Sequence, residues 1–164
     1  MTLPDWMTRL PWDHIRKAAD DYKFDPLILA AIIQQESAGD PFAIRYEPNW
    51  DYEFNLRHFA DLNRITVKTE KVCQSCSWGL MQIMGTVARE LGHDGPLTKL
   101  VDIEINLRLG AKKLKDLAYK RDTEEDMIAS YNAGHAQKKP SGMYVNQRYV
   151  DKVCGYLREL RKLN

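Results

Sequence analysis

The 164-residue sequence lacks an excess of either charge, a long apolar run and a large set of cysteines. Lysine and arginine number 24 against 23 aspartate and glutamate, so the net charge of +1 excludes the strong basic excess typical of dedicated nucleic-acid-binding proteins. The longest uncharged stretch, residues 72–88, contains Gln, Ser, Thr and Gly, which argues against a membrane span. These absences exclude the fibrous, membrane and disulfide-framework classes.

The three cysteines, Cys73, Cys76 and Cys154, allow at most one disulfide within the chain. Cys73 and Cys76 form a lone C-x-x-C motif, which is compatible with redox chemistry, half a zinc site or two loop thiols. A structural zinc needs about four ligands, and no second close pair of Cys or His follows. We therefore expect reduced cysteines and no metal, with a disulfide or metal staple as the alternative.

What is present is the composition of an ordinary globular protein, with 44% apolar and 29% charged residues. A length of 164 residues predicts a single domain. Aspartates interrupt the first residues where a secretory signal would need an apolar core segment. We therefore expect a chain made in the cytoplasm without a signal peptide.

Apolar residues at helical spacing predict a mostly α fold. The clearest helix start is Asp25-Pro26, a capping side chain followed by proline in the first turn. The helix that it opens, residues 27–37, is apolar nearly all round, which is typical of a central core helix. Further helices are predicted over 11–22, 103–117, 123–131 and 149–160, with Pro11 at a first helical position and Thr123 as a cap.

The region 45–76 is different, because no convincing alternating strand pattern appears outside residues 45–72. Ile65-Thr66-Val67 is a candidate strand, which we expect to pair with residues 51–55. The prediction is a single domain over residues 1–164 with an irregular insertion at about 45–76. The insertion also gathers aromatic side chains, which form either a surface flap or a small satellite core: Tyr46, Trp50, Tyr52, Phe54 and Phe59.

Glu36 is the strongest candidate for a catalytic residue. It lies in the last turn of the apolar 27–37 helix, where both the helix dipole and an apolar setting disfavour the charged carboxylate. Both effects raise the pKa of a carboxyl group, as a general acid near neutral pH requires. A surface glutamate at a frayed helix end is the alternative interpretation.

Three segments in order resemble the lytic transglycosylases of the soluble-lytic-transglycosylase type, glycoside hydrolase family 23, which are related to goose-type lysozyme. Glu36-Ser37 matches the family's glutamate-serine pair, and residues 79–82 match its Gly-Leu-Met-Gln motif. Residues 130–134 match its Ala-Tyr-Asn-Ala-Gly motif, with Ser130 replacing the first alanine. The resemblance spans residues 12–157, with 45–76 unmatched, and implies a lysozyme-like, mostly α (α+β) fold.

The resemblance implies cleavage of the β-1,4 bond from N-acetylmuramic acid to N-acetylglucosamine in peptidoglycan. Glu36 would act as acid and then as base, leaving a 1,6-anhydro-muramic end, without a metal or another cofactor. Trp78 would either stack on a sugar ring or cover the core. Met81 would either line the saccharide groove or pack in the core. The substrate contacts implied are Ser37, Trp78, Met81, Gln82, Tyr131, Asn132 and Tyr149.

Two other functions stay open. The first is a goose-lysozyme-like muramidase, because an inverting hydrolase needs a second carboxylate about 6.5–9.5 Å from the first, and the insertion offers Glu47, Asp51, Glu53 and Asp61. The second is a non-catalytic cell-wall-binding protein. We expect a monomer whose partner is the glycan strand, without nucleic acid or an integral membrane segment. A phage or prophage endolysin that reaches the periplasmic or extracellular wall by a holin-dependent route fits these expectations.

Overall fold

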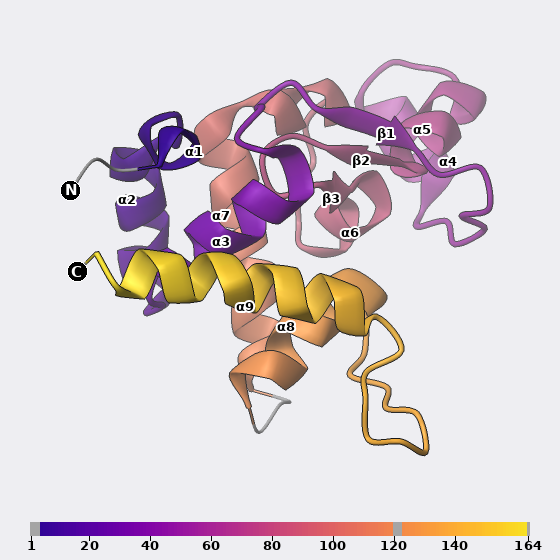
Figure 1. The fold of residues 1–164 in the computed structure, drawn as a ribbon. Helices are drawn as coiled ribbons and strands as arrows, with labels where there is room; N and C mark the ends of the chain where they lie inside the picture. The colour runs from indigo at the N-terminus through magenta and orange to yellow at the C-terminus, as the bar shows by residue number, and fades with distance from the viewer. Residues whose placement is uncertain (1–3, 120–122, 164) are drawn as a thin grey trace. The chain divides into compact units, whose positions relative to one another are not determined.

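The computed structural model describes residues 4–119 and 123–163, and most of them are helical (Figure 1). They divide into two compact units, each considered by itself: Met1–Gly39 with Ala111–Asn164 (unit 1), and Asp40–Gly110 (unit 2). The prediction of a mostly α fold is confirmed. The elements are α1 (Asp5–Thr8), α2 (Trp12–Tyr22), α3 (Pro26–Ser37), β1 (Ile44–Tyr46), α4 (Leu56–Leu62), α5 (Val67–Gln74), β2 (Cys76–Trp78), β3 (Ile83–Met84), α6 (Gly85–Glu90), the 3-10 helix η1 (Leu97–Val101), α7 (Ile103–Ala118), α8 (Glu124–Ala133) and α9 (Gln147–Arg161).

Helix α3 forms the centre of unit 1. The Asp25 side chain accepts a 2.9 Å hydrogen bond from the Leu27 amide, and Pro26 is the first helical residue, as predicted. Residues 28–33 are all buried, because α2 and α9 both pack against this helix (Figure 1). A helix covered on so much of its surface can be apolar nearly all round.

The other helices of unit 1 follow local signals. Thr123 caps α8 by accepting a 3.0 Å hydrogen bond from the Asp126 amide, as predicted. Pro11 is the residue before α2 rather than its first residue. Helix α9 begins at Gln147, two residues before the predicted start, and packs against both α3 and α8.

Unit 2 contains an antiparallel sheet in the order β1-β2-β3. Ile44 lies opposite Trp78, and Trp78 lies opposite Ile83 on its other side. The turn from β2 to β3 is residues 79–82, where Gly79 and Gln82 both have positive φ, at 69° and 46°. The motif that resembles the transglycosylases is therefore a tight turn between two buried strands.

The predicted strand at residues 65–67 is wrong. The Thr66 hydroxyl accepts a 3.1 Å hydrogen bond from the Thr69 amide and caps α5, which begins at Val67. An N-cap threonine has extended backbone angles, so its local preference resembles that of a strand. The sheet forms instead where 44–46 meets 76–78, and residues 51–55 belong to no strand.

The predicted insertion at 45–76 is more regular than expected, because it contains α4 and α5. Phe59 is buried and its ring centroid lies 6.1 Å from that of Phe54, so these two form a satellite core. Tyr46 and Tyr52 are about half exposed. The aromatic residues of the insertion therefore divide between packing and surface.

The cysteines are unbridged: Cys76 is buried, and Cys73 and Cys154 are half-buried. Burial raises the pKa of all three thiols. Within 4–119 and 123–163, no group of His, Cys, Asp and Glu is arranged to hold a metal ion. Over the same residues, no helix has both the length and the apolar character needed to cross a membrane.

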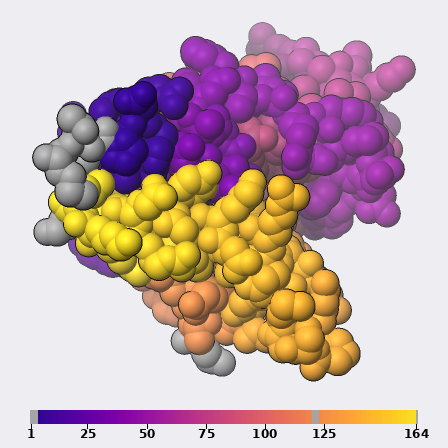
Figure 2. Space-filling view, in the orientation of Figure 1, coloured from indigo at the N-terminus to yellow at the C-terminus, as the bar shows by residue number. Residues whose placement is uncertain are grey.

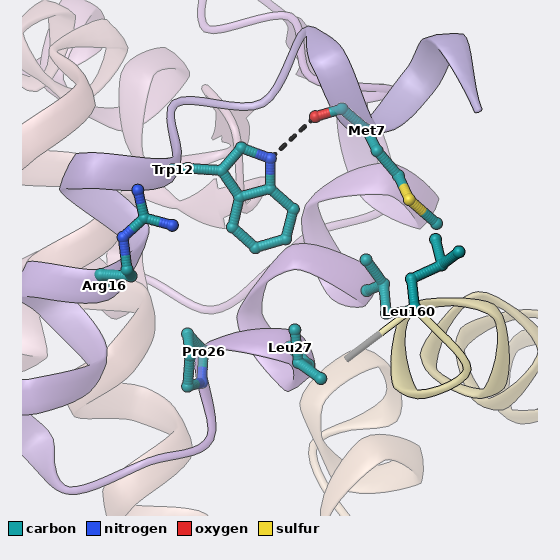
Figure 3. Close-up of a pocket in the computed structure, with 7 residues that line it drawn as sticks. Met7, Trp12, Arg16, Pro26, Leu27 and Leu160 are labelled. Atoms are coloured by element: carbon teal, nitrogen blue, oxygen red, sulfur yellow. Dashed lines mark hydrogen bonds between the residues drawn. The ribbon is translucent and has the colours of Figure 1, made fainter. Parts of the chain in front are cut away.

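A largely apolar cavity of about 390 Å³ lies in unit 1 at the start of α3. Figure 3 shows the Trp12 indole beside it, donating a 2.8 Å hydrogen bond to the Met7 carbonyl. Leu27 lines the cavity, and it lies nine residues before Glu36. At 1.5 Å per residue, about 14 Å of helix separates the two positions. The cavity is therefore distinct from the Glu36 site. Its lining is Met7, Trp12, Arg16, Pro26, Leu27, Leu160 and Leu163.

Candidate active site

Glu36 and Tyr149 meet in unit 1 although 113 residues separate them. The Tyr149 hydroxyl donates a 2.7 Å hydrogen bond to Glu36 Oε1. Helices α3 and α9 pack together along their lengths, which brings the last turn of one beside the first turns of the other. Ala38 ends α3 in the left-handed conformation, with φ of 53°, so Glu36 remains within the last turn. The carboxylate is half-buried.

Opposing effects act on the charge of Glu36. The end of the helix dipole and partial burial disfavour the carboxylate, whereas the Tyr149 hydroxyl stabilises it by donating a hydrogen bond. Burial, together with the charge of Glu36, raises the pKa of Tyr149 well above its usual value. Tyr149 therefore stays a hydrogen-bond donor at neutral pH.

Lys113 and Tyr131 extend this cluster from α7 and α8. The Lys113 ammonium donates a 2.8 Å hydrogen bond to the Tyr131 carbonyl and lies 3.9 Å from the centroid of the Tyr131 ring. Burial lowers the pKa of Lys113 to about 8, and the negative charge of Glu36 opposes that shift. Tyr131 is 2% exposed, and burial raises its pKa well above the usual value. Lys113 and Tyr131 are thus close enough to Glu36 for its charge to raise the pKa of each.

Sequence reasoning missed Lys113. It stands beside Lys112 in a helix with many charged residues, and lysine in such a helix normally faces solvent. Only the helical spacing offered a signal, since Lys113 lies three residues after Gly110 and so shares part of the apolar face.

Replacing Lys113 with methionine should change how stability depends on pH. Between pH 8 and 10.5 the unfolded chain binds more protons at this lysine than the folded chain does, so the natural chain becomes more stable as pH rises. From pH 7 to 11 its free energy of unfolding should increase by roughly 1–3 kcal/mol relative to Lys113→Met, allowing for solvent at a half-buried side chain. Urea denaturation across this range measures the difference.

The matched control is Lys139→Met, which removes an exposed lysine from the same unit. Its stability relative to the natural chain should not vary with pH in this range. A difference between Lys113→Met and the natural chain that stays constant from pH 7 to 11 would contradict the lowered pKa.

Two further predicted contact residues lie in unit 1. The Ser37 hydroxyl donates to the Ile33 carbonyl at 3.3 Å and accepts from the Gly39 amide at 3.2 Å, so it closes the helix end. Asn132 is exposed, and its Oδ1 accepts a 3.0 Å hydrogen bond from Asn146. Direct contact of Ser37 and Asn132 with substrate stays a prediction.

The predicted contact residues of unit 2 lie in the β2–β3 turn. Trp78 is 5% exposed and Met81 is fully buried, which favours the packing role that the sequence left open for each. The Gln82 amide donates to the carbonyls of Ala43 and Gly79, and its oxygen accepts from Ser77. Gln82 therefore holds the turn in shape.

Asn106, in α7, anchors the same turn. Its side chain accepts from the Met81 amide and donates to the carbonyls of Trp78 and Leu100, each at 2.8 Å. At Gly79 a Cβ would overlap this side chain. Four residues after Asn106, a Cβ at Gly110 would overlap the Met81 sulfur. The polar core of unit 2 thus fixes the Gly-Leu-Met-Gln motif rigidly.

Two of the carboxylates considered as a second catalytic group are paired with cations. Glu47 accepts a 2.6 Å hydrogen bond from Arg45, and Glu53 pairs with Lys71. A fully buried carboxylate does exist in the insertion, at Glu70, but the guanidinium of Arg89 holds it. Sequence reasoning missed this pair, because 19 residues and a sheet separate its members.

Comparison with known proteins agrees with the family resemblance that the three motifs indicate. The family model described as "Transglycosylase SLT domain" matches residues 13–152. A relative named "Membrane-bound lytic murein transglycosylase F", from Desulfosudis oleivorans (strain DSM 6200 / JCM 39069 / Hxd3), is 33% identical over 153 residues. The alignment covers 88% of this chain and 27% of that relative, so the chain spans about a quarter of the relative's length. A match over residues 13–152, with the three motifs in order, shows that this chain belongs to the transglycosylase SLT domain family.

Proposed function

We propose that this chain is a peptidoglycan lytic transglycosylase that cleaves the β-1,4 bond between N-acetylmuramic acid and N-acetylglucosamine. The observation that carries the proposal is the half-buried Glu36 carboxyl, hydrogen-bonded to Tyr149 at 2.7 Å, in a chain of the SLT family. Partial burial and the C-terminal end of a helix both favour the protonated form of a carboxyl group, which is the form that a general acid needs.

In the proposed reaction Glu36 first gives its proton to the glycosidic oxygen, and the bond from that oxygen to the muramic C1 breaks. The C6 hydroxyl oxygen of the same muramic residue then bonds to C1, and its proton passes to the Glu36 carboxylate. The enzyme regains its starting protonation state, and the sugar ends as a 1,6-anhydro ring. No water enters the products, so one carboxylate serves both steps.

The neighbours of Glu36 have supporting roles in this proposal. Tyr149 orients the carboxyl group and stabilises its charged form between the two steps. Lys113 supplies a positive charge at neutral pH that favours the carboxylate left by the first proton transfer. We further propose that Ser37, Tyr131 and Asn132 lie along the path of the glycan strand, and that Gln82 and the packed Trp78 and Met81 shape the turn in unit 2.

The products of digestion test the proposed reaction. Purified peptidoglycan incubated with the chain and then treated with borohydride should yield fragments whose muramic ends are anhydro and unreduced. Mass spectrometry distinguishes these ends from reducing ends, which gain a water in the cleavage and hydrogen in the treatment. Muramic ends that become reduced would show a goose-lysozyme-like hydrolase instead.

The proposed partner is the glycan strand, and the proposed place of action is the cell wall, on its periplasmic or extracellular side. The chain would act as a monomer. A phage or prophage origin with holin-dependent release is part of the proposal, and expression with and without a holin tests it. Lysis that is equally fast without the holin would contradict that route.

A further inference from the structure

Lys113, on α7, contacts one residue of α8 in two different ways. Helix α8 ends at Ala133, so Tyr131 lies in its last turn, where the helix itself supplies no amide donor to the carbonyls. The Lys113 ammonium donates a 2.8 Å hydrogen bond to the Tyr131 carbonyl. The same ammonium lies 3.9 Å from the centroid of the Tyr131 ring. One cation therefore holds both the backbone and the ring of this residue.

Capping of α8 alone does not account for a lysine in this position. Water or an exposed side chain can satisfy the last carbonyls of a helix without removing a charge from solvent. Burial lowers the pKa of Lys113 to about 8, so its ammonium form is costly here. The negative charge of Glu36 offsets part of that cost. The cation is therefore coupled to the candidate acid as well as to the end of α8.

The groups that face Glu36 differ in their charge at neutral pH. Burial, together with the charge of Glu36, raises the pKa of Tyr131 and of Tyr149 well above the usual value, so both phenols are neutral. Lys113 stays mostly protonated below about pH 8. Of these three groups, Lys113 is the one that brings a positive charge to the carboxylate.

The helices that pack against α3 bury apolar side chains on their described residues. Those of α2 are Ile15, Ala18 and Ala19, and those of α9 are Val150, Val153, Leu157 and Leu160. The basic residues in the first turns of α9, Arg148 and Lys152, are exposed, so water and salt screen their charges. The half-buried ammonium of Lys113 is screened less, and its effect on Glu36 is correspondingly larger.

We propose that Lys113 is a positioning residue for cleavage, which holds Tyr131 in place and uses its positive charge to set the pH at which Glu36 gives up its proton. A cation near a carboxyl group favours the charged form, so Lys113 makes Glu36 a stronger acid. The same charge leaves fewer molecules with a protonated Glu36 as pH rises. Lys113 therefore determines the upper pH limit of the reaction. The inference rests on the proposed function and names how pH regulates that same site.

Three substitutions of Lys113 separate its charge from its hydrogen bond. Lys113→Met removes both, Lys113→Gln keeps a donor for the Tyr131 carbonyl, and Lys113→Arg keeps both. On soluble glycan strands, kcat/KM of the natural chain should fall at high pH as Glu36 loses its proton. This descending limb should move up by roughly 0.5–1 pH unit in Lys113→Met and Lys113→Gln, and stay in place in Lys113→Arg.

The size of kcat reports the positioning of Tyr131. It should fall about tenfold in Lys113→Met, because a small displacement of a positioned group is costly. The loss should be smaller in Lys113→Gln, which keeps the hydrogen bond. A purely structural lysine would lower kcat in the variants without moving the limb of the pH profile.

The matched control is Lys139→Met, which removes an exposed lysine from the loop between α8 and α9. Figure 2 shows this loop in orange at the surface. The control should keep the descending limb of the natural chain. A limb that stays in place in Lys113→Met and Lys113→Gln would overturn the inference. An equal movement in Lys113→Arg or in Lys139→Met would overturn it too.

Titration of Glu36 makes the test independent of the reaction. NMR of the chain with ¹³C-labelled glutamate, assigned with Glu36→Gln, should show a higher pKa of Glu36 in Lys113→Met and Lys113→Gln than in the natural chain. An unchanged titration of Glu36 would overturn the inference whether or not the chain cleaves. A raised pKa in variants of a chain that releases no anhydro products would support the electrostatic role of Lys113 and contradict the proposed reaction.

Discussion

Replacing Glu36 with glutamine should lower the rate of peptidoglycan cleavage by about 10²- to 10⁴-fold, the range that a positioned acid–base group contributes. Glutamine keeps the shape of the side chain, and its carbonyl oxygen still accepts the hydrogen bond from Tyr149, so α3 and α9 should pack as before. It cannot, however, donate a proton to the glycosidic oxygen. Turbidity loss of a wall suspension and anhydro-product formation both measure the effect.

Glu159→Gln is the matched control, since it removes one exposed carboxylate of α9 away from the site. It should cleave at the rate of the natural chain. Sedimentation with intact walls should show that Glu36→Gln still binds them. Cleavage by Glu36→Gln as fast as by the natural chain would remove Glu36 from the catalytic role. Wall binding by a natural chain that releases no fragments would favour the wall-binding protein instead.

The largest expected effect on stability is at Arg89. Its guanidinium donates to both carboxylate oxygens of Glu70, at 2.8 and 3.0 Å, and to the carbonyls of His93 and Gly95, both at 2.7 Å. It also lies 4.3 Å from the centroid of the Phe59 ring. Both ionic side chains are fully buried. Arg89→Met leaves the Glu70 carboxylate buried without its cation, and we expect a loss of about 3–5 kcal/mol in the free energy of unfolding.

Urea denaturation measures this loss, and two companion variants test its cause. Arg45→Met breaks the exposed pair with Glu47 in the same unit and should cost at most about 1 kcal/mol. The double variant Glu70→Met with Arg89→Met removes both charges and should be more stable than Arg89→Met alone. A double variant less stable than the single one would show that the loss of the hydrogen bond that Gln74 donates to Glu70, rather than an unpaired charge, dominates.

Features that depend on neighbours within a few residues could be predicted from the sequence. Asp25-Pro26 and Thr123 begin their helices because a cap is satisfied two or three residues away. Local signals are ambiguous at Thr66, because an N-cap residue with extended backbone angles resembles a residue of a strand. A single residue with extended angles serves either structure, and only the next turn of helix distinguishes them.

Pairings across long stretches of chain could not be predicted in the same way. The sheet joins Ile44 to Trp78, and the buried ion pair joins Glu70 to Arg89. The sequence contains both partners of each pair, but no local pattern indicates which residue contacts which. Residue type alone does not show which acid of the insertion is buried. The acids considered as a second catalytic group are solvent-accessible, whereas Glu70 is the buried one.

The sequence by itself determined the helical class, the family and the identity of the candidate acid, because helix caps, apolar periodicity and ordered motifs are properties of contiguous residues. Only the tertiary structure decided what surrounds Glu36: a tyrosine 113 residues away and a half-buried lysine on a third helix. Packing of α3 against α9 placed the tyrosine beside the carboxylate. A desolvated carboxylate is stabilised by hydrogen-bond donors and cations wherever they lie along the chain. Helix packing therefore set the electrostatic environment of a residue that the motif had already identified.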